Sequence, residues 1–250
     1  MRLFLTSFQK AGTHQIMPAL GMAADIVDRG GNDLRNVPRR YGMSRTVDSD
    51  VIEENCKQLR DFSCGRGADG TKLFGHLSFR PEYYEAVCSK PTKIIVNIRD
   101  PRDVVVSNYY NIQRLHFGKH PGHGHLNFFD HKANKVLMDT EDPISALIEI
   151  DAARWKHWLG WLNPEFENVM VVKYRELRND GEATIKKIAD FIAPHPLHIS
   201  RALRKMRPDM TVPRVRRCIT GEHKELFEPH HMELANELMG DTIEKLGYEL

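Results

Sequence analysis

The sequence contains few cysteines and no long apolar run. Its four cysteines, Cys56, Cys64, Cys88 and Cys218, form no C-x-x-C pair, so a zinc site is not expected. Wide cysteine spacing in a chain of this size is typical of reduced thiols in a cytosolic protein. No apolar run approaches the roughly 20 residues that cross a bilayer, and the apolar start is too short for a signal peptide. We therefore expect a cytoplasmic protein without a transmembrane segment.

An excess of charge of one sign is also missing. The 36 Lys and Arg residues nearly balance the 34 Asp and Glu residues, leaving a formal net charge of +2, which is too small to indicate bulk binding to nucleic acid. Apolar residues make up 41% and charged residues 28% of the 250 residues, as in ordinary soluble globular proteins. A chain of this length can bury a full hydrophobic core without disulfides or metal ions to stabilise it. No internal repeat or low-complexity linker divides the sequence. We expect one domain over residues 1–250.

Short apolar runs alternate with segments of helical periodicity. The strand-like runs lie at 2–6, 71–75, 93–98 and 169–174. The helix-like segments lie at 13–29, 50–62, 81–89, 101–116, 142–162, 180–193 and 229–246. This alternation favours an α/β fold of three layers (α/β/α), with a central, mostly parallel sheet. Ligands in such folds bind at the carboxyl ends of the strands, so the candidate site residues are sought there.

The first strand is followed by a loop with the composition of an anion-binding site. Residues 7–14 read S-F-Q-K-A-G-T-H and lead into a predicted helix. Gly12 lets the backbone approach a ligand closely, and the amides of residues 11–14 would stand at the positive end of the helix dipole. Lys10 adds a full positive charge. The sequence therefore predicts a P-loop-like phosphate site here.

This loop differs from a Walker A motif, in which Lys follows the last Gly and precedes a magnesium-binding Ser or Thr. Lys10 instead precedes Gly12, and the chain contains no G-K-S or G-K-T tripeptide. A P-loop-type nucleotide or small-molecule kinase is therefore the alternative and not the leading hypothesis.

A second strand-to-helix turn also carries phosphate-binding side chains. It lies in K-I-I-V-N-I-R-D-P-R-D-V-V-V-S, residues 93–107. Arg99 follows the predicted strand and offers a planar fork for phosphate oxygens, and Ser107 offers a hydroxyl on the predicted helix. Pro101 suits the first helical position and Asp103 the first turn.

These turns resemble two motifs of sulfotransferases that depend on 3′-phosphoadenosine 5′-phosphosulfate (PAPS). The family's 5′-phosphosulfate loop reads roughly P-K-[SAG]-G-T-[TH]-[WFL] and its 3′-phosphate motif R-[DN]-x-x-D-x-x-x-S, which residues 9–15 and 99–107 match. Residues 171–180 resemble its Y-E-D-L segment. Residues 216–224, R-R-C-I-T-G-E-H-K, resemble its late R-K-G-x-x-G-[DE]-[WH]-K loop. The four matches stand in the family's order and span residues 7–224.

The resemblance implies a donor and a set of roles. The donor would be PAPS, the product adenosine 3′,5′-bisphosphate (PAP), and no metal would be needed. Lys10 would contact the oxygen that bridges phosphate and sulfate, and Tyr174 would approach the adenine. The other donor-binding residues implied are Ala11, Gly12, Thr13 and His14 at the 5′-phosphate, and Arg99, Ser107, Arg216 and Arg217 at the 3′-phosphate.

Three positions depart from the family motifs. Gln9 replaces a Pro, and Gln15 replaces an aromatic residue that often stacks on adenine. Cys218 replaces a Gly, so we expect a different backbone angle in the late loop. None of the three removes a phosphate-binding group, so the departures affect the packing of adenine and not the chemistry.

Transfer of a sulfuryl group also needs a base for the acceptor's proton. His76 follows the strand-like run 71–75, and imidazole titrates near neutral pH. In sulfotransferases that use a histidine base, the histidine follows the strand before the 3′-phosphate strand, as His76 does. The alternative is a carboxylate base, for which Glu82 is the nearest candidate.

No motif identifies the acceptor. We expect transfer to a hydroxyl or amine of a small molecule, glycan or lipid, with no nucleic-acid partner and with the oligomeric state open. A second alternative is a catalytically silent nucleotide-binding module, against which the presence of Lys10 and His76 argues.

Two clusters are interpreted conservatively. Five histidines within 116–131 are separated by glycines and prolines that fix no ligand geometry, so this segment is interpreted as a substrate lid and not as a metal site. Trp155, Trp158 and Trp161 recur at helical spacing and are interpreted as a core face and not as a sugar platform.

Overall fold

The computed structural model describes residues 2–23, 49–61, 71–117, 139–192, 199–206 and 217–250. Its contacts divide the chain into two compact units. The first combines Met1–Arg35, Asp48–Arg99 and Trp158–Cys218, and the second combines Asn36–Val47, Asp100–His157 and Ile219–Leu250. Each unit is built from segments far apart in the sequence and is described by itself. The single domain over 1–250 stays a prediction.

The first unit contains the parallel sheet that the sequence predicts. Its strands are β1 (Arg2–Ser7), β2 (Thr71–Gly75), β3 (Thr92–Ile98) and β4 (Val169–Lys173). Their order in the sheet is β2-β1-β3-β4, and every neighbouring pair is parallel. The register pairs Thr6 with Gly75 and Ser7 with Asn97. The carboxyl ends of the first three strands therefore meet at one edge.

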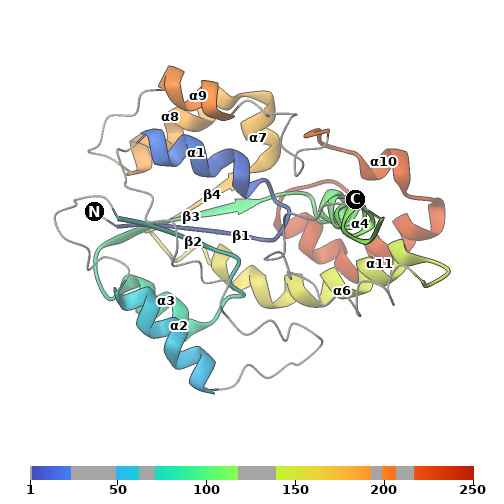
Figure 1. The fold of residues 1–250 in the computed structure, drawn as a ribbon, viewed down its shortest axis with the longest axis horizontal. Coiled ribbons are helices and arrows are strands. Elements are labelled where there is room, and N and C mark those ends of the chain that lie inside the picture. Colours follow the sequence, from blue (N-terminus) through green and yellow to red (C-terminus); the bar gives the residue numbers. More distant parts are fainter. Residues whose placement is uncertain (1, 24–48, 62–70, 118–138, 193–198, 207–216) are drawn as a thin grey trace. The chain divides into compact units, whose positions relative to one another are not determined.

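Helices cover both faces of this sheet (Figure 1). On one face lie α1 (Thr13–Ala23), α7 (Tyr174–Asn179), α8 (Gly181–Ile192) and α9 (Ile199–Met206). On the other lie α2 (Ser49–Asp61) and α3 (Pro81–Cys88). This arrangement is the three-layer α/β/α architecture that the sequence predicts.

Alternate residues of β1 face the two layers because successive strand side chains point to opposite faces. Leu3 and Leu5 join a buried cluster with Ile16 of α1 and with Ile185 and Ile188 of α8. Burial of each such side chain contributes about 1.5–3 kcal/mol.

Phe4, between Leu3 and Leu5, packs instead against Trp161, with ring centroids 5.8 Å apart. Trp161 belongs to the short 3₁₀ helix η2 (Leu159–Leu162) and donates its indole N–H to the carbonyl of Leu77 at 2.9 Å. All three tryptophans of the sequence pattern, Trp155, Trp158 and Trp161, are buried, which confirms that they form core and not an exposed platform.

The second unit contains the helices α4 (Pro101–Phe117), α6 (Pro143–Trp158, apart from its last residue), α10 (His223–Leu226) and α11 (Pro229–Lys245). Asn108 of α4 donates to the buried carboxylate of Asp151 on α6 at 2.8 Å. Arg102 forms a buried ion pair with Asp100 at 2.9 Å. No helix in the described ranges is long and apolar enough to cross a membrane.

Candidate active site

The loop after β1 forms a tight turn at the edge of the sheet where the first three strands end. Lys10 and Gly12 both have positive φ, 67° and 92°. The amide of Ala11 closes the turn on the carbonyl of Phe8 at 3.1 Å, so this amide is used within the loop. The first amides of α1, which begins at Thr13, have no intrahelical acceptor. They are the groups of the loop best suited to an anion.

Gly12 is required by its surroundings. At its φ of +92°, side chains are strained, and a Cβ atom there would overlap the ring of Tyr174. Tyr174 is the first residue of α7, directly after β4, so the fold packs the predicted adenine-contacting residue onto the predicted phosphate loop.

We expect Gly12→Ala to weaken binding of PAP at least about 10-fold, because the added methyl group displaces either the loop or Tyr174. Calorimetric titration with PAP measures the effect. Gly247→Ala is the matched control: Gly247 also has positive φ, 72°, but it follows α11 and is not part of the loop. The control should lower the melting temperature and leave the affinity for PAP unchanged. Equal affinities for PAP in Gly12→Ala and wild type would contradict the steric argument.

Ser7, at the end of β1, holds the loop and the candidate base together. Its hydroxyl hydrogen-bonds Thr13 at the start of α1, and His76 Nδ1 lies 2.8 Å from its carbonyl and 3.1 Å from its hydroxyl. A carbonyl oxygen only accepts, so His76 Nδ1 carries a proton. In the neutral ring the lone pair is then on Nε2, which is the atom a general base would use.

Side chains at the end of β3 and directly after it support the same loop. Asn97 is fully buried and donates to the carbonyl of Ala11 at 2.8 Å. Arg99 donates to the carbonyl of Lys10 at 3.5 Å, and its guanidinium lies 4.8 Å from the centre of the Tyr174 ring. Arg99 is therefore a buried cation at the loop, as a phosphate-binding residue should be.

Tyr174 is held in its protonated form. Burial, opposed in part by the charge of Arg99 and assisted by a hydrogen bond with Cys218, raises the pKa of the Tyr174 phenol to about 12.

The expected change of backbone angle at Cys218 stays a prediction. Cys218 has a φ of 51°, which lies in the left-handed region that a glycine would favour. For a non-glycine residue this conformation carries a local conformational cost.

The other predicted site residues are distributed as follows. His14 lies in the first turn of α1, and Ser107 lies half-buried on the second turn of α4, in the second unit. Arg217 is exposed, whereas Arg216 lies outside the described residues, as does most of the histidine-rich segment 116–131. Glu82, the carboxylate alternative to His76, is exposed on α3, and no described contact places it at the loop. Gln9 and Gln15 are partly buried.

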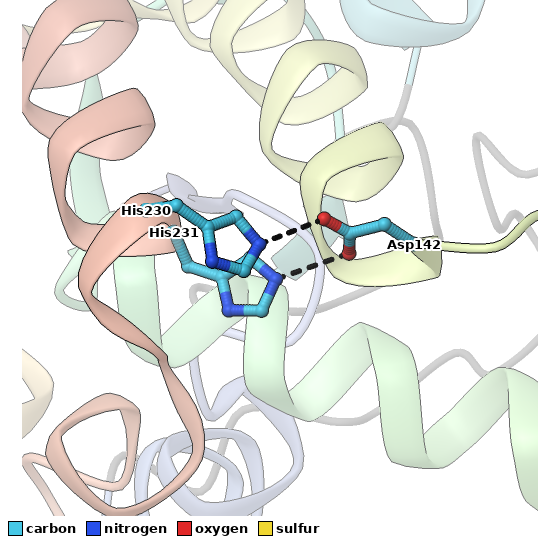
Figure 2. Close-up of side chains that lie close together, drawn as sticks. All are labelled: Asp142, His230 and His231. Carbon is cyan, nitrogen blue, oxygen red and sulfur yellow. Dashed lines mark hydrogen bonds and ion pairs between the residues drawn. The ribbon is translucent and has the colours of Figure 1, made fainter.

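Asp142, His230 and His231 form a cluster in the second unit that the sequence analysis missed (Figure 2). His231 Nε2 lies 3.0 Å and His230 Nε2 3.1 Å from the two oxygens of Asp142. The signal in the sequence was weak, because a pair of histidines and a single Asp 88 and 89 residues away share no motif.

Although the cluster contains metal-ligand residue types, its hydrogen bonds favour a histidine–carboxylate bridge. His231 Nδ1 accepts the backbone N–H of Glu228 at 3.0 Å, so Nε2 carries the proton that is donated to Asp142. A metal at Nε2 would force that proton to Nδ1, against another N–H. In addition, α6 and α11 both begin beside the cluster, at Pro143 and Pro229, and helix N-termini disfavour cations.

We expect Asp142→Asn to lower the melting temperature by about 2–4 °C near neutral pH. Burial opposes ionisation of Asp142, but hydrogen bonds from Ser145, His231 and His230 outweigh it and hold the pKa of Asp142 well below its ordinary value. The stabilisation is therefore present above the ordinary carboxyl pKa and is lost as the pH falls below about 4. Thermal melts of both proteins across pH measure it.

The difference between wild type and Asp142→Asn should shrink as the pH is lowered below about 4. A difference that grows as the pH falls below that value would contradict this assignment. Melts with added zinc or with a chelator test the bridge against a metal site. A zinc-dependent rise in melting temperature that Asp142→Asn abolishes would overturn the bridge and the prediction of no metal.

Known proteins provide an independent comparison. A family model of the sulfotransferase domain matches residues 2–247. The chain therefore belongs to the sulfotransferase family. Mouse sulfotransferase 2A1 is 30% identical over 105 residues, which cover 42% of this chain and 32% of the mouse protein. Luciferin sulfotransferase of Photinus pyralis is 30% identical over 161 residues, 63% of this chain and 38% of the firefly protein. The aligned segments thus span about a third of the length of these relatives.

Solved structures show the same fold over nearly the whole chain. Mouse sulfotransferase SULT7A1 complexed with PAP is 19% identical with a TM-score of 0.60, covering 98% of this chain and 87% of that one. A sulfotransferase from Alicyclobacillus acidocaldarius is 16% identical with a TM-score of 0.53, covering 99% and 96%. At these identities the likeness establishes the fold, and the fold class predicted from the sequence is confirmed.

Proposed function

We propose that this protein is an enzyme that transfers the sulfuryl group of PAPS to a hydroxyl or amine of an acceptor. The observation that carries the proposal is the geometry at Ser7. One residue at the end of β1 contacts both the start of α1, where an anion would bind, and Nδ1 of His76. The phosphate loop and the candidate base are thus fixed to the same point of the sheet edge.

The residues of the first unit fit the donor. Tyr174 packs where a Cβ atom on Gly12 would stand, so the residue proposed to flank the adenine lies against the loop proposed to bind the 5′-phosphate. Arg99 is a buried guanidinium beside the loop and beside Tyr174, and a guanidinium binds phosphate oxygens as a fork. Structural neighbours that contain PAP include SULT7A1 and a retinol dehydratase, which is in complex with androsterone as well.

Different residues of the chain carry out the separate parts of in-line transfer. His76 Nε2 accepts the proton of the acceptor as its oxygen or nitrogen bonds to sulfur, and Nδ1–H stays on the carbonyl of Ser7. Lys10 and the amides at the start of α1 stabilise the negative charge that develops on the bridging oxygen as its bond to sulfur breaks. Arg99 with Ser107, Arg216 and Arg217 holds the 3′-phosphate, and Tyr174 flanks the adenine.

The acceptor is a small molecule, glycan or lipid in this proposal. The relatives include proteins named 3-alpha-hydroxysteroid sulfotransferase, from Cavia porcellus, and luciferin sulfotransferase, which differ too much in their named substrates to select one. A cytoplasmic location, expected from the cysteine spacing, is part of the proposal and is tested by cell fractionation.

The deciding experiment combines donor binding with a transfer assay. Purified protein is titrated with PAP and then incubated with PAPS labelled in its sulfate, with a panel of steroids, phenols, amines, glycans and lipids. Binding of PAP and transfer of label to an acceptor support the proposal. Magnesium-dependent turnover of ATP would support a kinase instead, and tight binding of PAP without transfer to any acceptor would support a silent module.

A further inference from the structure

Asp103 makes contacts that its position in the sequence does not explain. It lies in the first turn of α4, where an acid ordinarily faces solvent and interacts with the helix dipole. Here only 1% of its side chain is exposed. Oδ2 accepts the backbone N–H of Gly221 at 2.8 Å, and Oδ1 accepts the backbone N–H of His223 at 3.2 Å.

His223 adds a third hydrogen bond to the same carboxylate. Its ring Nδ1 lies 2.8 Å from Asp103 Oδ1, and because a carboxylate accepts, Nδ1 is the donor. The ring is 2% exposed and lies edge-on to Phe227, with centroids 6.0 Å apart. A buried aspartate therefore organises three donors from residues 221–223.

These three residues belong to the late motif 216–224 and include no strand and only the first residue of α10. Without Asp103, the two backbone N–H groups would lack this acceptor, which is costly wherever such a group is buried. The conformation of this part of the late motif thus depends on a side chain 118 to 120 residues earlier in the chain.

The same helix also carries a predicted donor ligand. Ser107 is four residues after Asp103, so the two side chains share one face of α4. Asp103 holds residues 221–223, and the arginines implied at the 3′-phosphate, Arg216 and Arg217, precede these residues in the same motif.

We propose that Asp103 and His223 form a positioning pair that fixes the late motif, residues 216–224, so that Arg216 and Arg217 reach the 3′-phosphate of the donor. The pair acts through the segment and does not itself contact the donor. This inference rests on the proposed function, since it assigns the pair to the donor site of that enzyme.

A purely structural role is the competing explanation. A structural pair, when broken, would lower stability and affect all kinetic constants alike. A positioning pair would raise the KM of PAPS and the Kd of PAP selectively, with little change in the KM of the acceptor. The comparison of these constants is therefore the readout.

Three substitutions separate the roles. Asp103→Asn replaces one accepting oxygen with an N–H₂ group that faces the N–H donors of the segment. His223→Leu removes the ring donor. His223→Asn keeps a donor close to the position of Nδ1, and it should restore much of the donor affinity that His223→Leu loses.

We expect Asp103→Asn to raise the Kd of PAP about 10–100-fold, and His223→Leu to raise it about 10-fold, with acceptor KM changed less than about 3-fold. If Asp103→Asn does not fold, the comparison of the Kd of PAP between His223→Leu and His223→Asn still distinguishes a positioning role from a purely structural one. Equal Kd values for PAP in wild type, His223→Leu and His223→Asn would overturn the proposal, as would equal rises in the KM of donor and acceptor.

Asp142→Asn is the matched control. Asp142 also lies at the start of a helix in the second unit and also accepts from histidine side chains, but it is not in a donor motif. It should lower stability without changing the Kd of PAP. Failure of the wild type to bind PAP would refute the proposed function itself. Normal binding by the wild type and by all three variants would refute the positioning pair alone.

Discussion

Replacement of Lys10 by alanine should reduce kcat about 100-fold to 1000-fold, as removal of a transition-state charge stabiliser does in other enzymes. Lys10 is part of the turn between β1 and α1, and its backbone carbonyl is held by Arg99. The substitution removes the ammonium group and leaves the backbone of the turn in place. The charge on the bridging oxygen develops during transfer, so the effect should fall on kcat more than on the Kd of PAP.

Two variants sharpen this experiment. Lys10→Met keeps a long unbranched side chain at a position with φ 67°. The two side chains differ mainly in charge, so this variant measures the effect of the ammonium group alone. Lys186→Met is the control, because Lys186 is an exposed residue of α8 that pairs with Asp190 at 2.9 Å. Sulfate-transfer rates and PAP titrations are compared across the set. Near-normal kcat in Lys10→Ala would show that the assignment of Lys10 to the leaving group is wrong.

Replacement of His76 by asparagine should also have a large effect, about 100-fold to 10,000-fold on kcat. The structure makes this variant informative, because an asparagine N–H₂ group lies near the position of imidazole Nδ1 and preserves the hydrogen bond to the carbonyl of Ser7. Only the base atom Nε2 is lost. The loop should therefore keep its conformation, and the Kd of PAP should change little.

The pH profile provides the second readout for His76. A base acts in its deprotonated form, so kcat/KM of the wild type should fall as the pH is lowered through the titration of the base, and this acidic limb should be absent in His76→Asn. His157→Asn, an exposed histidine on α6, is the control and should keep the limb. Persistence of the limb in His76→Asn, together with its loss in Glu82→Gln, would assign the base to the carboxylate.

The strands could be predicted from the sequence to within about a residue. The run 71–75 coincides with β2, and 169–174 differs from β4 by one residue. Buried parallel strands are covered on both faces, so they form continuous apolar runs that are visible without any tertiary information. The one-residue difference at β4 arises because Tyr174 already begins α7.

Helix α9 (Ile199–Met206) was not predicted. Its three basic residues are Arg201, Arg204 and Lys205, and Arg207 follows directly after the helix in the sequence, which gives the segment the composition of a solvated charge run. The structure shows that Ala202 is buried in the cluster with α1 and α8 and that Leu203 packs against it. A short helix with so few apolar positions has too weak a periodicity to be recognised, because packing and not propensity stabilises it.

The sequence by itself determined the family and the identity of the donor-site candidates. Lys10, Gly12, Thr13, Arg99 and Ser107 stand at fixed spacings within two strand-to-helix turns. Local motifs of this kind are readable because the backbone geometry of one turn and the charge it presents depend on neighbouring residues.

Only the tertiary structure decided how these residues are oriented and held. The carbonyl of Ser7 sets the tautomer of His76 across 69 residues, Tyr174 makes glycine necessary at position 12, and Asp103 holds residues 221–223. A hydrogen bond or a steric overlap needs two groups within a few ångströms of each other, and folding, not spacing along the chain, brings such distant residues together.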